Sequence, residues 1–438
     1  MILKKLIITL FLMILTSAGF TQNRQNWPHW RGPDHNGISK AVNLPTTWSS
    51  TDHIVWKTKL PWWSAATPII WGDKIFIVSP SASGDQNKER TARDPGGSEL
   101  ILLAISKTNG DILWQQRLDS KNQLHRKQND ASPSPVTDGQ HVWVVTGTGK
   151  VIAFDMNGNR IWTRDLQADY GRFGHNWGYA SSPLFYKGSL FIEVLHGMKT
   201  DDPSYILSIN AANGKTQWHH ERPTDAVEES PDAYTTPLLV NYQGKTEIII
   251  SGGDYVTGHD LKTGKEIWRA AGLNPYHRGN YRIISSPIFS NGIIYAPTRK
   301  KPLLALKAGG VGDITNSHLL WKWDGSGTPD VPSPLCDGEY FYMVDDVGNI
   351  TCLNAKTGTL VWGPNSTTGG IVSASPIHAE GRIYIINEEG KTAIVQAGKD
   401  FKLIASNELD GSYTLSSPAV SDSRLYIRTA YYLYCIGN

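Results

Sequence analysis

The chain has 438 residues and is rich in turn formers and aromatic residues, with 42 Gly, 24 Pro, 16 Trp and 18 Tyr. Frequent Gly and Pro imply many turns, and Trp and Tyr favour pleated strands, so the composition indicates an all-β protein. The 42 basic residues nearly balance the 40 acidic ones, and no polybasic run occurs. The sequence therefore argues against nucleic acid and anionic membrane surfaces as partners.

Residues 1–21 have the pattern of a secretory signal peptide. Lys4 and Lys5 precede an apolar run from Leu6 to Leu15, and small residues follow. After cleavage, no other stretch is apolar and long enough to be a transmembrane segment. We therefore expect residues 22–52 to form an N-terminal extension and residues 53–438 to form one repetitive domain, which is periplasmic or secreted.

The first repeated signature is a short apolar strand, a Gly turn, and a strand with Trp four residues after the Gly. Asn-Gly or Thr-Gly between two strands is a tight hairpin signal, because Gly accepts a positive φ without strain. Five copies have this spacing: Gly110 to Trp114, Gly158 to Trp162, Gly214 to Trp218, Gly264 to Trp268 and Gly358 to Trp362. Two degenerate copies follow the same plan, one with a longer loop ending at Trp321 and one without Trp over 393–404.

A second signature alternates with the first and consists of a small residue, a Pro and a strand. Pro is tolerated where a strand begins, because no ladder partner needs its missing N–H. Eight copies lie 42 to 67 residues apart, at Pro68, Pro135, Pro183, Pro237, Pro287, Pro334, Pro376 and Pro418. Four antiparallel strands per unit at this period predict the blades of a β-propeller.

The ends of the chain predict how the ring closes. The last unit has three strands and then the chain stops, whereas residues 53–60 form a Trp strand with no strands before it. If this N-terminal strand completes the last blade, eight blades of four strands close without two exposed sheet edges. Each repeat Trp is then expected to fill the space between neighbouring blades, rather than to stack on a ligand.

These repeats resemble the propeller repeat of the pyrroloquinoline-quinone (PQQ) type, with its Ala-Leu-Asp-x-x-Thr-Gly-x-x-x-Trp pattern. The best matches are 257–268, 350–362 and 151–162, and residues 27–37 are similar to the segment that opens many exported propellers of this type. The resemblance implies an eight-bladed fold over about 53–438. It covers both quinoprotein alcohol dehydrogenases, which use PQQ and calcium, and the non-enzymatic propeller of the outer-membrane protein assembly machinery.

Cysteine usage argues against the dehydrogenase. The quinoprotein enzymes place two adjacent, disulfide-bonded cysteines over the cofactor, but Cys336, Cys352 and Cys435 are all separated. Cys336 and Cys352 fall on the first and third strands of one predicted blade, too far apart for a disulfide, so free thiols are expected. Glu193 lacks the flanking glycines of the family's calcium-binding glutamate, so no metal ligand and no catalytic residue is assigned.

A meander places its long loops on one face of the ring. The loops between second and third strands and the connections between blades emerge together, and we call this side the long-loop face. Aromatic, Arg, His and Asn side chains concentrate there and are suited to stacking and hydrogen bonding. The candidate ligand-binding residues are Arg172, His175, Trp177, His277, Arg278 and Arg282. The alternative is that these side chains only tie the loops together.

The leading hypothesis is an exported, non-catalytic propeller without a cofactor that binds a protein partner or small ligand on its long-loop face. The first alternative is a quinoprotein-type oxidoreductase using PQQ and calcium. A second is a polysaccharide-degrading enzyme, which would need paired carboxylates across the channel.

Overall fold

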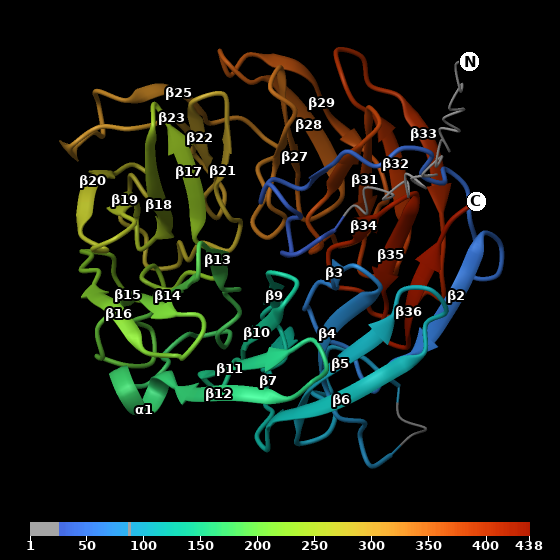
Figure 1. The fold of residues 1–438 in the computed structure, drawn as a ribbon. Helices are drawn as coiled ribbons and strands as arrows, with labels where there is room; N and C mark the ends of the chain where they lie inside the picture. Colours follow the sequence, from blue (N-terminus) through green and yellow to red (C-terminus); the bar gives the residue numbers. More distant parts are fainter. Residues whose placement is uncertain (1–25, 86–88) are drawn as a thin grey trace, which may run out of the picture.

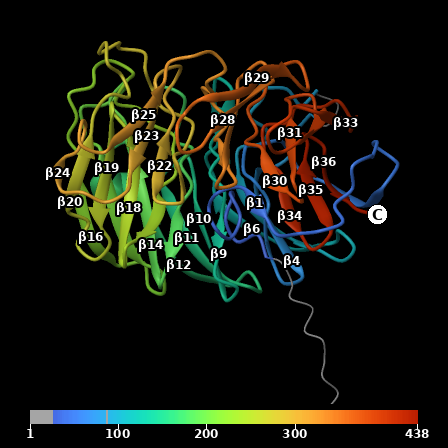
Figure 2. The ribbon, with the colours of Figure 1, turned by 90° about the horizontal axis from the view of Figure 1, so that it is seen from above.

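Eight sheets stand around a common axis in the computed structural model, which describes residues 26–85 and 89–438 (Figure 1). Each sheet contains the four antiparallel strands predicted from the repeats, and the side view shows the strands running between the two faces of the ring (Figure 2). The predicted signal peptide, residues 1–21, lies outside the described residues. No helix in the described part of the chain has the length and apolarity to cross a bilayer; α1 (Leu166–Tyr170) has five residues.

The strands of the first four blades follow the chain in order. Blade 1 contains β3 (Ile69–Trp71), β4 (Lys74–Pro80), β5 (Leu100–Ser106) and β6 (Ile112–Asp119). Blade 2 contains β9 (Val136–Thr137), β10 (His141–Val145), β11 (Lys150–Asp155) and β12 (Arg160–Asp165). Blade 3 contains β13 (Leu184–Tyr186), β14 (Ser189–Val194), β15 (Tyr205–Asn210) and β16 (Thr216–Glu221). Blade 4 contains β17 (Leu238–Tyr242), β18 (Lys245–Gly252), β19 (Tyr255–Asp260) and β20 (Glu266–Ala270).

The last four blades continue this order until the ring closes. Blade 5 contains β21 (Ile288–Ser290), β22 (Ile293–Ala296), β23 (Leu303–Lys307) and β25 (Leu319–Trp323). Blade 6 contains β26 (Leu335–Cys336), β27 (Tyr340–Val344), β28 (Asn349–Asn354) and β29 (Leu360–Ser366). Blade 7 contains β30 (Ile377–Ala379), β31 (Arg382–Ile386), β32 (Thr392–Gln396) and β33 (Leu403–Asn407). Blade 8 contains β34 (Ala419–Ser421), β35 (Arg424–Arg428), β36 (Tyr432–Ile436) and the N-terminal β2 (Ile54–Lys59).

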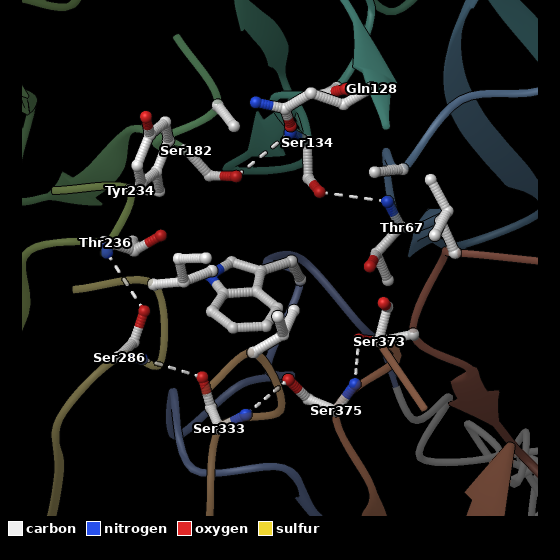
Figure 3. Close-up of a pocket in the computed structure, with 18 of the residues that line it drawn as sticks. Thr67, Gln128, Ser134, Ser182, Tyr234, Thr236, Ser286, Ser333, Ser373 and Ser375 are labelled. Atoms are coloured by element: carbon white, nitrogen blue, oxygen red, sulfur yellow. Dashed lines mark hydrogen bonds between the residues drawn. The ribbon is translucent and has the colours of Figure 1, made fainter. Parts of the chain in front are cut away.

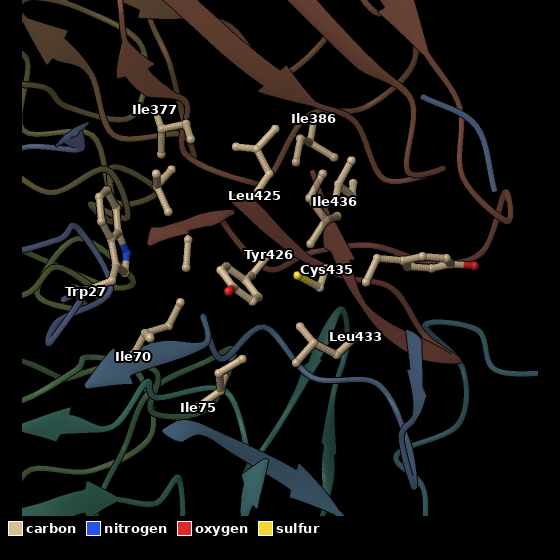
Figure 4. Close-up of a cluster of buried hydrophobic side chains, with 14 of the residues drawn as sticks. Trp27, Ile70, Ile75, Ile377, Ile386, Leu425, Tyr426, Leu433, Cys435 and Ile436 are labelled. Carbon is tan, nitrogen blue, oxygen red and sulfur yellow. The ribbon is translucent and has the colours of Figure 1, made fainter. Parts of the chain in front are cut away.

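Ring closure is confirmed by the pairing of β2 with the last strand of the chain. β2 runs antiparallel to β36, with Lys57 opposite Tyr434 and Thr58 opposite Leu433. An apolar cluster from blades 7, 8 and 1 packs around this closure, and Figure 4 shows Ile377, Tyr426 and Ile75 within it. The two ends of the propeller domain are therefore joined both by a ladder and by a shared core.

The Gly–Trp spacing is explained by contacts between neighbouring blades. In six blades the outer-strand indole donates its N–H to a backbone carbonyl in the outer turn of the next blade, at 2.9–3.3 Å. The turn glycines Gly110, Gly158, Gly214, Gly264 and Gly358 have positive φ and lie directly against these rings. The turn therefore requires Gly for two reasons: its backbone has a positive φ, and the indole that covers it leaves no room for a Cβ atom.

Two additional strands depart from the strict repeat. The long loop of blade 5 contains β24 (Gly312–Asp313), which pairs in parallel with β20 of blade 4. Trp268 of β20, which pairs with Gly312, donates its indole N–H to Glu247 Oε2 of its own blade at 2.9 Å. β1 (Ile38–Ser39), from the N-terminal extension, pairs in parallel with β30 of blade 7.

Candidate functional site

An axial cavity of about 300 Å³ lies where the eight first strands begin. Its walls include the residue that precedes each repeat Pro, and in all eight blades that residue carries a hydroxyl. We call these residues the hydroxyl ring: Thr67, Ser134, Ser182, Thr236, Ser286, Ser333, Ser375 and Ser417.

The hydroxyl ring is held by hydrogen bonds from blade to blade. The hydroxyl oxygens of the six ring serines each accept the backbone N–H of the preceding ring residue, at 2.9–3.0 Å. Figure 3 shows this chain around the cavity, for example from Ser286 to Ser333 and on to Ser375. The first strands are thus fixed around the axis, and their hydroxyls remain in contact with the cavity.

The N-terminal extension crosses the axis beneath this ring. Trp27 pairs with Ile70 of blade 1, and Ile38 pairs with blade 7. Between them, residues 29–35 line a small void against the first strands of blades 4 and 5, on the far side of the axis, so this segment spans the channel. Trp30 lines both the axial cavity and a smaller void beneath it, and therefore forms the cavity floor. Arg31 is buried and donates to the carbonyls of Pro334 and Pro376, and burial lowers its pKa to about 9.

One wall of the cavity is an aromatic and charged cluster from the long-loop face. Arg282 donates to Asp330 Oδ2 at 3.0 Å, and its guanidinium lies 5.4 Å from the centre of the Trp177 ring. The Trp177 indole donates to Glu229 Oε1 at 2.8 Å. Burial raises the pKa of Asp330, while Arg282 opposes that rise. In this wall the positive charge of Arg282 is therefore largely neutralised by the neighbouring carboxylates.

A short hairpin of β7 (Leu124–His125) and β8 (Gln128–Asn129) reaches across the mouth of the cavity. Lys127, in its turn, forms an ion pair of 2.5 Å with Glu388 in blade 7. Gln128 donates to the backbone carbonyls of Trp177 and Gly178 on the other side. The hairpin thus links loops from opposite parts of the ring at the open end of the channel.

The predicted site residues separate into three groups. Trp177 and Arg282 line the axial cavity together. His175 is buried beside them and stacks on His196 at 5.5 Å, and burial followed by the charge of His196 lowers its pKa. Arg172, His277 and Arg278 are exposed and contribute nothing to the cavity lining. The structure therefore joins two of the six at one site.

The acidic residues of the cavity fit neither a calcium–PQQ site nor a hydrolase. Asp330 and Asp346 lie on the same wall, since Asp346 Oδ1 accepts the backbone N–H groups of Asp330 and Val331 at 3.1 Å. Burial, followed by the charge of Asp330, raises the pKa of Asp346 to about 6. Among the described residues no three His, Cys, Asp or Glu side chains are grouped to hold a metal ion. Paired carboxylates across the channel are likewise not found in this lining.

The thiol prediction is confirmed, because Cys336, Cys352 and Cys435 are free and buried. The sequence interpretation missed the hydroxyl ring and Trp30. A Ser or Thr precedes every repeat Pro in the sequence, but a strand start accounts for this pattern without a ring. No comparable repeated signal marks Trp30, because the extension occurs once in the chain.

Comparisons with known proteins agree with this architecture. The family model described as outer membrane protein assembly factor BamB matches residues 97–363 and 307–433. The assembly factor BamB of Yersinia pestis is 22% identical over 381 residues, covering 84% of this chain and 85% of that protein. Tetrathionate hydrolase of Acidithiobacillus ferrooxidans is 24% identical over 258 residues, covering 53% of this chain and 47% of that enzyme.

Solved structures show the same fold at low sequence identity. BamB from Moraxella catarrhalis superposes with a TM-score of 0.60 at 14% identity, covering 87% of this chain and 96% of that one. A europium-containing methanol dehydrogenase superposes with a TM-score of 0.66 at 12% identity, covering 92% and 89%. The fold is therefore common to an assembly factor and a dehydrogenase, whereas the BamB family model matches most of this sequence. The chain belongs to the family of the outer membrane protein assembly factor BamB.

Proposed function

We propose that this protein is an exported, non-catalytic and cofactor-free propeller that acts in the periplasm by binding a protein partner through its long-loop face. The match to the assembly-factor family over residues 97–433 carries the proposal. The relatives are named as factors that assemble outer membrane proteins, and we extend that class of role to this chain.

The long-loop face offers apolar side chains for such a partner. Met198, Val227, Tyr276, Val347 and Ile371 all lie in loops on this face, and Tyr276 is 74% exposed. Exposed apolar side chains on this face are available to pack against a protein partner. Val311, which is 79% exposed in the outer loop of blade 5, lies on the opposite face and serves as a matched control.

The experiment is an affinity purification from cross-linked envelopes of cells that produce the tagged protein. We expect a specific protein to co-purify with the wild type and with Val311→Asp, and to be lost with the double variant Met198→Asp/Tyr276→Asp. All variants should keep the wild-type unfolding temperature. Equal recovery with the double variant, or no specific partner, would refute the proposal.

The quinoprotein alternative is not favoured, because adjacent cysteines are missing from the sequence and the cavity acids are already paired or hydrogen-bonded. Mixing the protein with PQQ and Ca²⁺ should produce neither a saturable absorbance change nor alcohol-dependent dye reduction. Stoichiometric binding with turnover would replace our proposal with the enzyme.

A further inference from the structure

The axial cavity has the size and closure of a small-ligand site. Its volume of about 300 Å³ lies at the lower end of the range typical of such pockets. Trp30 closes it from below, and the β7–β8 hairpin narrows it from above. A ligand that enters from the long-loop face therefore meets an aromatic floor instead of passing through the ring.

The hydroxyl ring retains hydrogen-bonding capacity toward this space. A Ser or Thr hydroxyl has one donor and two acceptor positions, and the blade-to-blade bond uses one acceptor. Each of the six ring serines thus keeps a donor and an acceptor position, and Ser132 adds another hydroxyl to the lining. Such a wall matches a ligand whose own groups also both donate and accept.

The charged side chains of the cavity are already compensated within the protein. Arg282 is paired with Asp330, and Lys127 with Glu388. Asp346 accepts two backbone N–H groups. An anion or cation would have to compete with these partners, so the lining favours a neutral ligand.

We propose that the axial cavity binds one neutral sugar unit, free or at the end of a glycan. A pyranose has an apolar C–H face, which would pack on the Trp30 indole, and a rim of hydroxyls, which would meet the hydroxyl ring. Because Asp330 and Asp346 share one wall, no pair of acids flanks a glycosidic bond, and the sugar is bound without cleavage. This site is separate from the exposed loops assigned to the protein partner.

The test is isothermal titration of the full-length mature protein with methyl glycosides of glucose, galactose, mannose and N-acetylglucosamine, and with glucuronic acid as a charged comparison. We expect one-to-one binding of at least one neutral glycoside and weaker binding of glucuronic acid. Trp30→Ala should weaken binding at least about tenfold, whereas Trp30→Phe should keep most of the affinity. Val311→Ala, in the outer loop of blade 5 on the opposite face, should leave affinity unchanged.

A second variant tests the cavity without changing Trp30, in case the substitution of Trp30 unfolds the protein. Ala180→Phe leaves Trp30 in place and fills part of the cavity, so it should abolish binding while the unfolding temperature stays near that of the wild type. The proposal is overturned if no neutral glycoside binds, if glucuronic acid binds more tightly, or if both folded cavity variants bind like the wild type. Recovery of the protein partner does not depend on this result.

Discussion

The contact between a turn glycine and the neighbouring indole provides a quantitative test of how the blades cohere. Gly264 lies in the outer turn of blade 4 with φ +72°, and a Cβ atom there would lie 2.6 Å from Cδ2 of Trp218. Trp218 belongs to β16 of blade 3 and donates to the carbonyl of Leu261 in that same turn at 3.3 Å. Gly264→Ala should therefore strain the backbone and also displace the indole.

The matched control is Gly244→Ala, in the hairpin between β17 and β18 of the same blade. Gly244 has φ +77°, but a Cβ atom there would meet nothing within 4 Å. It should cost about 1 kcal/mol in free energy of unfolding, from the left-handed backbone alone. Gly264→Ala should cost about 3 kcal/mol, because the displaced ring and its hydrogen bond are added to the same strain.

Urea unfolding followed by circular dichroism measures both values. In a Trp218→Ala background the cost of Gly264→Ala should fall to that of the control, since the ring that it displaces is gone. Equal costs of the two glycine substitutions in the wild-type background would refute the inter-blade explanation of the Gly–Trp spacing.

Three further predictions concern charge, closure and thiols. Burial raises the pKa of Glu193 to about 8, although Thr235 and Arg222 oppose the rise. The wild type should therefore lose stability as the pH rises from about 4.5 to about 8. Glu193→Gln should make the unfolding temperature less dependent on pH between about pH 5 and about pH 8.5, and an equal dependence in both proteins would contradict this explanation. Thr58→Pro removes a backbone donor from β2 opposite Leu433 and should expose the edge of β36, giving oligomers in size-exclusion chromatography that Lys57→Ala does not give. The three buried free cysteines should react with a thiol reagent only in denaturant, and reductant should leave the unfolding temperature unchanged; a shift would indicate a disulfide.

Much of the fold could be predicted because the repeat encodes each blade locally. Every Gly turn and every pre-strand Pro restricts the backbone where it stands, and eight copies reinforce one another. The position of β2 could also be predicted, since an unpaired Trp strand at one end complemented a missing strand at the other. β24 could not, because the pairing of Gly312 and Asp313 with blade 4 depends on a loop without a repeat pattern.

The candidate site was less accessible to sequence reasoning. Arg172, Arg278 and Arg282 look alike along the chain, but only Arg282 lines the cavity, where Asp330 and Trp177 hold it. The residue type indicates which side chains can bind a ligand, whereas the direction in which each side chain points depends on how its loop packs. His175 illustrates the same limit: it lies two residues from Trp177, yet it points into a buried cluster with His196 and Tyr179.

The cavity joins parts of the protein that are far apart in sequence. Its floor comes from residue 30, its ring from all eight blades, and its lid from the connection between blades 1 and 2. A molecule bound there would contact a complete ring but not an opened one, because opening at β2 separates the first blade from the last. Ligand binding must then stabilise closure by mass action, so the unfolding temperature of the wild type should rise with ligand concentration more than that of Trp30→Ala. Ligand binding in the axial cavity and closure of the ring are therefore thermodynamically coupled.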